Sequence, residues 1–370
     1  MIVIHDSVRR GRKRVANEVV ALDVFCGAGG LSLGLQNAGI TVEAGIDLDP
    51  ICKYPFTKNV GAKFILADIA TIPTDALRQF YASARIRVLA GCAPCQPFSG
   101  YTSRTRSNDG RWQLLLHFFR LASELRPEII TVENVPRLSR HPVWQEFING
   151  LNDLGYWVEW RIVDAALYGV PQARQRLVLL ASNLGRVEIP SGMIGTKTVR
   201  DAIGNLAPVN AGERNARDRL HASRSLTSLN LERIRSSKPA GTWRDWPDEL
   251  RAACHTRASG RTYPSVYGRM SWDRPSPTIT TQFYGFGNGR FGHPEQDRAL
   301  TLREGAILQS FPRSFKFVKP DEPLNFRAIG RLIGNAVPPR LAQHIGATIM
   351  AHVGATAGAS SSPAVGREDL

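Results

Sequence analysis

The sequence predicts a doubly wound, Rossmann-like α/β domain followed by a smaller, irregular and mainly β domain. From residue 19 to about 183, short apolar segments rich in β-branched residues alternate with helix-like segments, a pattern that indicates βαβ units and a parallel sheet. After Arg186 the long apolar periods stop, and Arg, Gly, Pro and Ser become frequent. A length of 370 residues suits two or three domains of about 150 residues each.

The predicted elements follow one another without long gaps. The expected strands cover residues 19–25, 41–47, 63–68, 85–91, 128–134, 158–165 and 176–182. The expected helices cover residues 31–39, 50–59, 74–83, 111–125 and 143–155, with a last one starting near 339. Gly39 ends the first helix, and Pro127 stops the fourth because proline cannot continue a helix.

The composition excludes several classes of protein. A hydrophobic content of 43% with 21% charged residues argues against wholesale disorder. Unbroken apolar stretches stay short of the ~18 residues that a transmembrane helix needs, and the charged start does not resemble a signal peptide. Five scattered cysteines make a disulfide framework improbable and favour a reducing cytoplasm.

The charge is strongly basic, with 47 Lys and Arg against 32 Asp and Glu and a formal net charge of +15. Most of the basic residues are arginines, whose planar fork suits phosphate oxygens and base edges. Nucleic acid is therefore one candidate partner. A merely solvated basic surface explains the same composition, and charge alone leaves both interpretations open.

Chemically active side chains follow the predicted strands at the point where each strand ends. Because the carboxyl ends of parallel strands meet at one edge of a sheet, these side chains should lie close together. The segments concerned are Phe25–Gly30, Asp47, Asp68, Gly91–Gln96 and Glu133–Asn134.

The Gly-rich turn points to a nucleoside cofactor. It lacks the third glycine of the dinucleotide fingerprint, because Ser32 stands at that position, and no Walker lysine follows. Asp47 lies 20 residues beyond Gly27, the usual distance for an acid that binds ribose hydroxyls. A nucleoside without a pyrophosphate describes S-adenosylmethionine. A plain tight turn is the alternative.

Cys92 and Cys95 form a C-x-x-C. A redox pair and a zinc site are two interpretations, but no second cysteine pair completes a zinc site. The segment after Cys95 does not begin a good helix, as a redox cysteine would require. A nucleophile is the better interpretation of Cys95, and a structural role is preferred for Cys92.

The chain resembles the bacterial DNA (cytosine-5-)-methyltransferases of the restriction–modification type. Six motifs occur in the family's order between residues 21 and about 350, and together they leave little room for coincidence. They are Asp23–Gly39, Pro94–Gln96, Glu133–Val135, Gln172–Arg176, Arg298–Pro312 and Gly334–Val337.

The resemblance implies how the reaction proceeds. Cys95 would attack carbon 6 of cytosine, and Glu133 would compensate the charge at ring nitrogen 3. Arg176, with Arg174 nearby, would compensate oxygen 2, although a solvated or phosphate-bound role remains open for both arginines. Asn134 would fix the loop. Water is one candidate for the base that removes the carbon 5 proton.

The resemblance also implies the binding residues, with no metal. The cofactor would contact Phe25, Gly27, Gly29, Gly30, Leu31, Asp47, Leu48, Asp68, Ile69, Pro94, Asn335 and Ala336. Leu48 replaces a common aromatic residue and Ala336 a common serine, which removes a stacking face and a hydroxyl. DNA would contact Gln96, Ser99, Arg104, Arg106, Arg111, Thr280, Thr281 and Arg290.

The expected organisation has five segments. They are a flexible basic arm (1–18), the catalytic and cofactor-binding domain (19–186), the target-recognition domain (187–325), a segment that returns to the catalytic domain (326–354) and a disordered tail (355–370). The loop from Phe98 to Trp112 would close over a cytosine flipped out of the duplex.

The expected partner is double-stranded DNA, with a restriction endonuclease as a functional partner, no membrane, a monomeric state and a cytoplasmic location at the nucleoid. One alternative is a tRNA cytosine-5 methyltransferase, whose Cys-Phe-Thr tripeptide does not occur here. Another is a non-catalytic DNA-binding relative, which would be expected to lose Cys95 or Glu133. A thiol–disulfide protein is a third.

Overall fold

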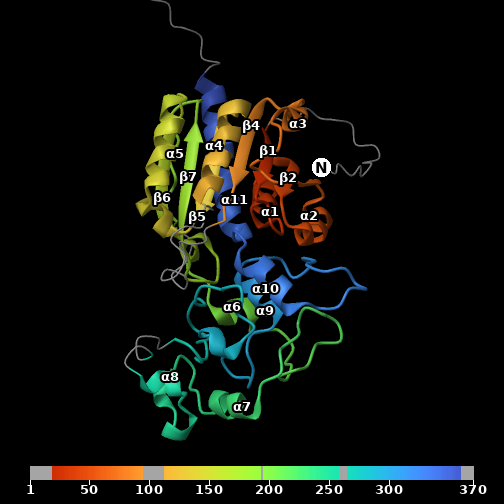
Figure 1. The fold of residues 1–370 in the computed structure, drawn as a ribbon, viewed down its shortest axis with the longest axis vertical. Coiled ribbons are helices and arrows are strands. Elements are labelled where there is room, and N and C mark those ends of the chain that lie inside the picture. Colours follow the sequence, from red (N-terminus) through yellow and green to blue (C-terminus); the bar gives the residue numbers. More distant parts are fainter. Residues whose placement is uncertain (1–18, 95–111, 193–194, 258–259, 261–264, 360–370) are drawn as a thin grey trace, which may run out of the picture.

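The computed structural model describes residues 19–94, 112–192, 195–257, 260 and 265–359. Figure 1 shows an elongated molecule with a sheet and its helices at one end, α7 (Ser228–Arg235) and α8 (Ala253–Thr256) at the other, and α9 (Leu302–Leu308) and α10 (Phe326–Gly334) between them. The expected alternation of strands and helices over residues 19–183 is confirmed.

The sheet in the described part of the chain has seven strands in the order β3-β2-β1-β4-β5-β7-β6. Every residue of the interior strand β1 is buried, as expected for a strand covered on both faces. The strands are β1 Val19–Val24, β2 Thr41–Asp47, β3 Lys63–Leu66, β4 Ile86–Gly91, β5 Ile129–Asn134, β6 Trp157–Asp164 and β7 Gln175–Ser182.

One strand departs from the expected parallel sheet. Strands β1 to β5 pair in parallel, but β7 runs antiparallel between β5 and β6. A parallel return needs a crossover of a dozen or more residues. The connection between β6 and β7 holds only a short 3-10 helix, Ala165–Tyr168, so the chain reverses direction instead.

Helices cover both faces of the sheet, and β1 sends alternate side chains to each face. Val20, Leu22 and Val24 join one apolar cluster with residues of α4 and α5, while Val19 and Ala21 join another with residues of α1 and α11. The helices are α1 Gly30–Asn37, α2 Lys53–Val60, α3 Asp75–Arg78, α4 Gln113–Leu125, α5 Pro142–Asp153 and α11 Pro339–Ala359.

Helix α11 brings the end of the chain back to the sheet. It packs closely on α1, where a Cβ on Gly34 would lie 2.3 Å from the Cβ of Ala342, so only glycine permits this approach. The helix continues to Ala359, which corrects the expectation of disorder for residues 355–359, and residues 360–370 of the expected tail lie outside the described part of the chain.

Residues 187–325 differ from the mainly β domain that the sequence predicts. Where this region is described, it contains short helices and isolated bridges such as Arg269–Gly292, with no strand of a sheet. Frequent Gly and Pro interrupt the alternation that a ladder requires. The α-helices of this region and the next are α6 Val199–Ile203, α7 Ser228–Arg235, α8 Ala253–Thr256, α9 Leu302–Leu308 and α10 Phe326–Gly334.

Single 3-10 turns complete the architecture. Besides Ala165–Tyr168, they are Pro50–Cys52, Gln79–Tyr81, Pro136–Arg140, Trp243–Asp245, Asp248–Leu250 and Phe286–Asn288.

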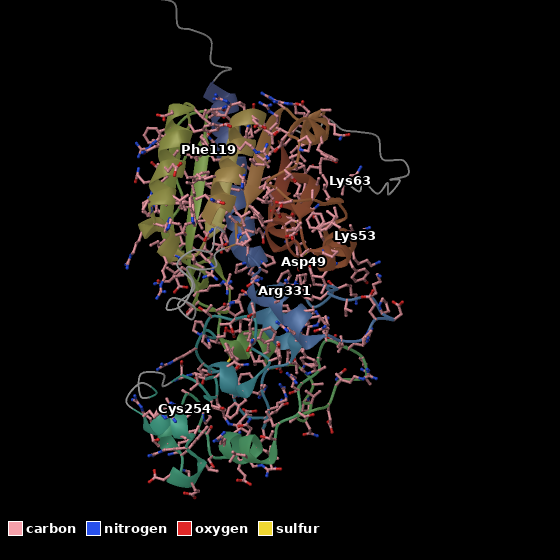
Figure 2. All side chains as sticks on the ribbon, in the orientation of Figure 1. Asp49, Lys53, Lys63, Phe119, Cys254 and Arg331 are labelled. Carbon is pink, nitrogen blue, oxygen red and sulfur yellow. The ribbon has the colours of Figure 1, made fainter. Side chains whose placement is uncertain are left out.

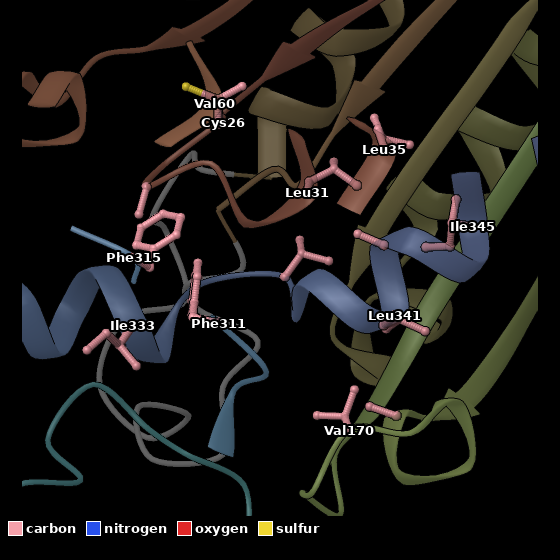
Figure 3. Close-up of a cluster of buried hydrophobic side chains, with 14 of the residues drawn as sticks. Cys26, Leu31, Leu35, Val60, Val170, Phe311, Phe315, Ile333, Leu341 and Ile345 are labelled. Carbon is pink, nitrogen blue, oxygen red and sulfur yellow. The ribbon is translucent and has the colours of Figure 1, made fainter. Parts of the chain in front are cut away.

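The apolar core continues from the sheet into the second region. Figure 3 shows Leu31 and Leu35 of α1 near Leu341 of α11, with Phe311 and Ile333 farther along the same cluster. A separate small cluster holds Ile234, Trp243, Trp246, Phe286 and Ala299. Part of the second region therefore shares the core of the sheet, and its distal part has a core of its own.

Candidate active site

The Gly-rich turn after β1 is tied to the end of β2. The N–H of Gly27 donates to Asp47 Oδ2 at 2.9 Å, and the N–H of Asp49 donates to Asp47 Oδ1 at 2.9 Å. Phe25 has a φ of 62° and Gly27 a φ of 53°, a left-handed conformation that is unusual for phenylalanine and often marks functional sites. Burial raises the pKa of the Asp47 carboxyl above its ordinary value.

The surroundings of Asp47 suit a nucleoside. Leu48 is 66% exposed beside it, and the Asp68 carboxylate, partly exposed at the end of β3, accepts a hydrogen bond from the N–H of Ala70 at 2.9 Å. Carboxylate oxygens keep free lone pairs for hydroxyl and amino donors, and Leu48 offers an apolar contact. These two acceptors and the apolar contact fit S-adenosylmethionine.

The closing motif of the sequence lies against the same turn. A Cβ on Gly30 would lie 2.3 Å from the carbonyl oxygen of Val337 and 3.5 Å from the Cβ of Ala336. The Asp49 carboxylate, next to the turn, forms an ion pair with Arg331 of α10 (Figure 2). The two distant segments that the sequence assigns to the cofactor are therefore neighbours.

Ser32 has a role that the sequence does not reveal. Its hydroxyl donates to the carboxylate of Asp23 at 2.5 Å, and both residues are fully buried. Burial raises the pKa of Asp23 to about 7. The residue that breaks the dinucleotide fingerprint thus anchors the first turn of α1 to β1.

Glu133 and Arg176 meet across the antiparallel pair of β5 and β7. Glu133 faces Val178 in the register, so Arg176 is its diagonal neighbour, within reach of a long side chain. Arg176 Nε lies 3.0 Å from Glu133 Oε1, and both side chains are largely buried. The contact is an ion pair rather than an aligned hydrogen bond. The reversal of β7 brings the two side chains together.

Cys92, directly after β4, contacts the same carboxylate. Its Sγ donates to Glu133 Oε2 at 3.0 Å, while its N–H donates to the carbonyl of Val24. The neighbouring Asn134 donates from Nδ2 to the carbonyl of Ala93 at 3.1 Å, a geometry that suits the expected loop-fixing role. Glu133 is therefore held between a thiol and a guanidinium.

Arg174 is buried among main-chain carbonyls. Its Nη1 donates to the carbonyl of Ile279 at 2.9 Å and its Nη2 to that of Gly334 at 3.0 Å. Gln172 accepts from the N–H of Ile279 and donates to Gln309. These contacts join the start of β7 to two later segments, which favours a positioning role for Arg174 over the solvated or phosphate-bound alternative.

A cleft of about 420 Å³ lies beside the same segment. Thr278, Thr280, Arg274 and Arg290 are among its lining residues, and Arg290 also donates to the carbonyl of Ala240. The backbone of Thr280 and Thr281 lies against Gly334, where a Cβ would come within 2.5 Å. The predicted DNA contacts of this region thus adjoin the start of β7.

Six of the predicted site residues lie outside the described part of the chain. They are Cys95, Gln96, Ser99, Arg104, Arg106 and Arg111. Among the cysteines that are described, Cys26 and Cys52 are buried and Cys254 is exposed. Burial raises the pKa of the Cys26 and Cys52 thiols, which suits apolar packing rather than nucleophilic attack.

The described residues include no helix long and apolar enough to cross a membrane. Their His, Cys, Asp and Glu side chains form no group of three or more that could hold a metal ion.

The family model for C-5 cytosine-specific DNA methylases matches residues 19–351, which is most of the chain. The chain belongs to this family. Membership of the family, together with the fold, implies a reaction that uses S-adenosylmethionine. The protein is therefore an enzyme of the DNA (cytosine-5)-methyltransferase class.

Individual relatives agree with the family. The chain is 48% identical over 337 residues to the Type II methylase M.HgiDII of Herpetosiphon aurantiacus, with 89% of this chain and 94% of that protein covered. It is 33% identical to the Type II methyltransferase M1.HphI of Haemophilus parahaemolyticus, with 89% and 86% covered.

Solved structures share the fold. The Entamoeba histolytica methyltransferase EhMeth is similar with a TM-score of 0.67 and 17% identity, covering 91% of this chain and 99% of that one. A prophage-encoded E. coli protein described as a DNA modification methyltransferase has a TM-score of 0.70 and 22% identity, covering 91% and 100%.

Three contacts escaped the sequence interpretation. The bond from Cys92 to Glu133 joins residues 41 positions apart, and no periodicity predicts it. The contact of Ser32 with Asp23 leaves only a weak signal in the sequence, namely a polar residue at a position where the pattern predicts burial. Gln172 stands in a recognised motif, but its partners lie more than 100 residues away.

Proposed function

We propose that the protein transfers a methyl group from S-adenosylmethionine to carbon 5 of a flipped-out cytosine within a specific double-stranded DNA sequence. The observation that carries the proposal is the buried pair of Glu133 and Arg176 beside the turn that binds Asp47. Family membership supports the choice of base and of the methylated atom.

The chain's own residues activate the ring. Carbon 5 of cytosine is a weak nucleophile, so the Cys95 thiolate forms a bond to carbon 6 and makes the ring electron-rich. Glu133 stabilises the charge at nitrogen 3 and Arg176 the charge at oxygen 2. When bound, S-adenosylmethionine supplies an electrophilic methyl group. Loss of the carbon 5 proton and departure of the Cys95 thiolate then restore the ring.

The cofactor is held at the rim of the sheet. Asp47 accepts from the ribose hydroxyls, Leu48 and Phe25 contact the adenine, and Asp68 and Ile69 contact its amino edge. The other proposed contacts are Gly27, Gly29, Gly30, Leu31, Pro94, Asn335 and Ala336.

Residues 187–325 form the target-recognition part, and the duplex lies against the cleft lined by Thr280 and Arg290. The target base must leave the stack because a thiol cannot reach carbon 6 inside a duplex. Thr281 adjoins the cleft, and Ser99, Arg104, Arg106 and Arg111 belong to the segment from Phe98 to Trp112 that closes over the base. Gln96, next to Cys95, is a further DNA contact. We place this activity in a bacterial cytoplasm, in a monomer whose functional partner is a restriction endonuclease.

Bisulfite sequencing of DNA from cells that express the protein tests the proposal and identifies the recognised sequence. We expect protected cytosines in one short sequence context, absent from cells that express Cys95→Ala. Methylated cytosine in tRNA but not in DNA would favour the tRNA alternative. Unmodified DNA and RNA, with the folded protein present, would overturn the proposal.

A further inference from the structure

Two side chains hold the buried carboxylate of Glu133 from different strands. Arg176 of β7 approaches Oε1, and Cys92, directly after β4, donates its thiol to Oε2 at 3.0 Å. The Glu133 side chain is only 3% exposed, so water cannot readily replace either partner. Cys92 is thus part of the polar surroundings of the site and not only an apolar contact.

The backbone fixes the thiol in place. The N–H of Cys92 donates to the carbonyl of Val24 and continues the pairing of β1 with β4. Asn134 donates to the carbonyl of Ala93, the residue after Cys92. The thiol and the carboxylate therefore stand on two anchored segments, and their separation does not depend on a free loop.

We propose that Cys92 is a positioning residue for methyl transfer, which fixes the orientation of the Glu133 carboxylate through its S–H. This inference rests on the proposed function. A carboxylate turns readily about its last torsion, and a thiol donor on one oxygen with a guanidinium ion pair on the other removes that freedom before the base arrives. The first cysteine of the C-x-x-C thus serves the glutamate rather than a redox pair.

A purely structural role makes a different prediction. Cys92 also packs against the apolar core, and a residue needed only to fill space would tolerate alanine with a loss of stability and no specific loss of rate. Serine separates the two roles, because it keeps the donor but is smaller than cysteine. Cys254 is exposed in the second region (Figure 2), and Cys254→Ala is the matched control for removal of a thiol.

The test compares Cys92→Ala, Cys92→Ser and Cys254→Ala with the unaltered enzyme in single-turnover methylation of a duplex that holds the recognised sequence. We expect Cys92→Ala to lower the rate at saturation about fivefold to tenfold, because a thiol is a weak donor but its partner is charged. Cys92→Ser should stay within about twofold. The dissociation constants for cofactor and DNA should not change.

A double-mutant cycle decides whether Cys92 acts through Glu133. In a Glu133→Gln background, Cys92→Ala should cause almost no further loss of rate. Independent, multiplying losses would overturn the inference, as would a Cys92→Ala rate equal to that of Cys254→Ala, or a Cys92→Ser variant as slow as Cys92→Ala. If Glu133→Gln itself turns over normally, the proposed function of the site fails instead.

Discussion

The sheet and the region that follows it satisfy their buried polar groups in opposite ways. In the sheet, ladders pair the backbone, and side chains such as Asp47 accept from leftover N–H groups at the rim. In residues 187–325, buried arginines donate to leftover carbonyls. Arg269 donates to four main-chain carbonyls, and Arg298 pairs with Glu304 in the interior.

The difference follows from the absence of ladders among the described residues of the second region. Backbone carbonyls that no strand or helix pairs still need donors when buried, and the guanidinium offers five in a fixed fork. Arg174, Arg269, Arg298 and Arg303 are each at most 5% exposed. Part of the arginine content behind the net charge of +15 is therefore structural, and the charge overstates the surface available to DNA.

The largest expected effect is that a substitution among the reactive side chains after the strands of the sheet abolishes methyl transfer but leaves the protein folded. Cys95→Ala should lower methyl transfer on the order of 10³-fold or more, because the reaction loses its nucleophile. Binding of DNA, measured by mobility shift, should survive. A comparable loss of binding would show that Cys95 supports the fold. Substitutions in the two regions would then no longer differ in whether they affect catalysis or stability.

In the second region, substitution of a buried charged residue should lower the stability of the fold. Glu304→Gln leaves the fully buried Arg298 without its carboxylate, and the loss of one partner of a buried pair costs ~3–5 kcal/mol. Unfolding by urea at pH 7 measures this change. Glu322→Gln, which removes an exposed partner of Lys319, is the control and should unfold at the same urea concentration as the unaltered protein.

The same pair predicts a response to acid. Arg298 holds the pKa of Glu304 down to about 2, although burial opposes it. The ionised form is therefore favoured by folding, and its contribution is present above about pH 4.5 and lost as the pH falls toward 2. Glu304→Gln should remove this part of the acid sensitivity. An unchanged acid profile would contradict the assignment.

For Asp23, in the sheet, we expect the free energy of unfolding to change with pH in the opposite direction. Because burial raises its pKa to about 7 from 3.8, the folded state favours the protonated acid. Its contribution to the free energy of unfolding is present below about pH 4 and falls by up to ~1.4 kcal/mol per pH unit as the pH rises toward 7. The free energies of unfolding of Asp23→Asn and of the unaltered protein should be measured from pH 5 to 8. The value for the variant should increase relative to that of the unaltered protein as the pH rises. A constant difference would mean that Asp23 does not titrate.

The smallest effect is expected from removal of residues 1–18. Loss of this basic arm should lower the slope of log affinity for DNA against log salt by roughly 0.9 for each phosphate contact that it makes. The recognised sequence should stay the same. A changed sequence preference would move part of the recognition into the arm.

The sheet could be predicted because its signals are local. Apolar runs such as 129–134, ending in Glu133 and Asn134, mark a strand and its chemistry together, and the rim follows from the parallel rule. The reversal of β7 could have been predicted from the missing helix between β6 and β7, but the alternation before it suggested otherwise.

The second region could not be predicted in the same way. The fold of this region depends on contacts between residues far apart in the sequence, such as that of Arg303 with Asp218 across 85 positions. No periodicity in the sequence predicts such contacts. The same holds for Cys92, whose neighbours in the sequence suggest a redox or structural cysteine. Its partner Glu133 becomes visible only when β4 and β5 are placed side by side.

Mass spectrometry of the protein after incubation with cofactor and a duplex carrying 5-fluorocytosine at the recognised position tests the central claim most directly. A base cannot abstract the fluorine that replaces the carbon 5 proton, so the Cys95 thiolate is not eliminated and the enzyme should remain covalently bound to the methylated DNA through Cys95. We predict one adduct, located on the peptide that contains Cys95 and absent from Cys95→Ala. A folded protein that methylates DNA without forming this adduct would contradict the account.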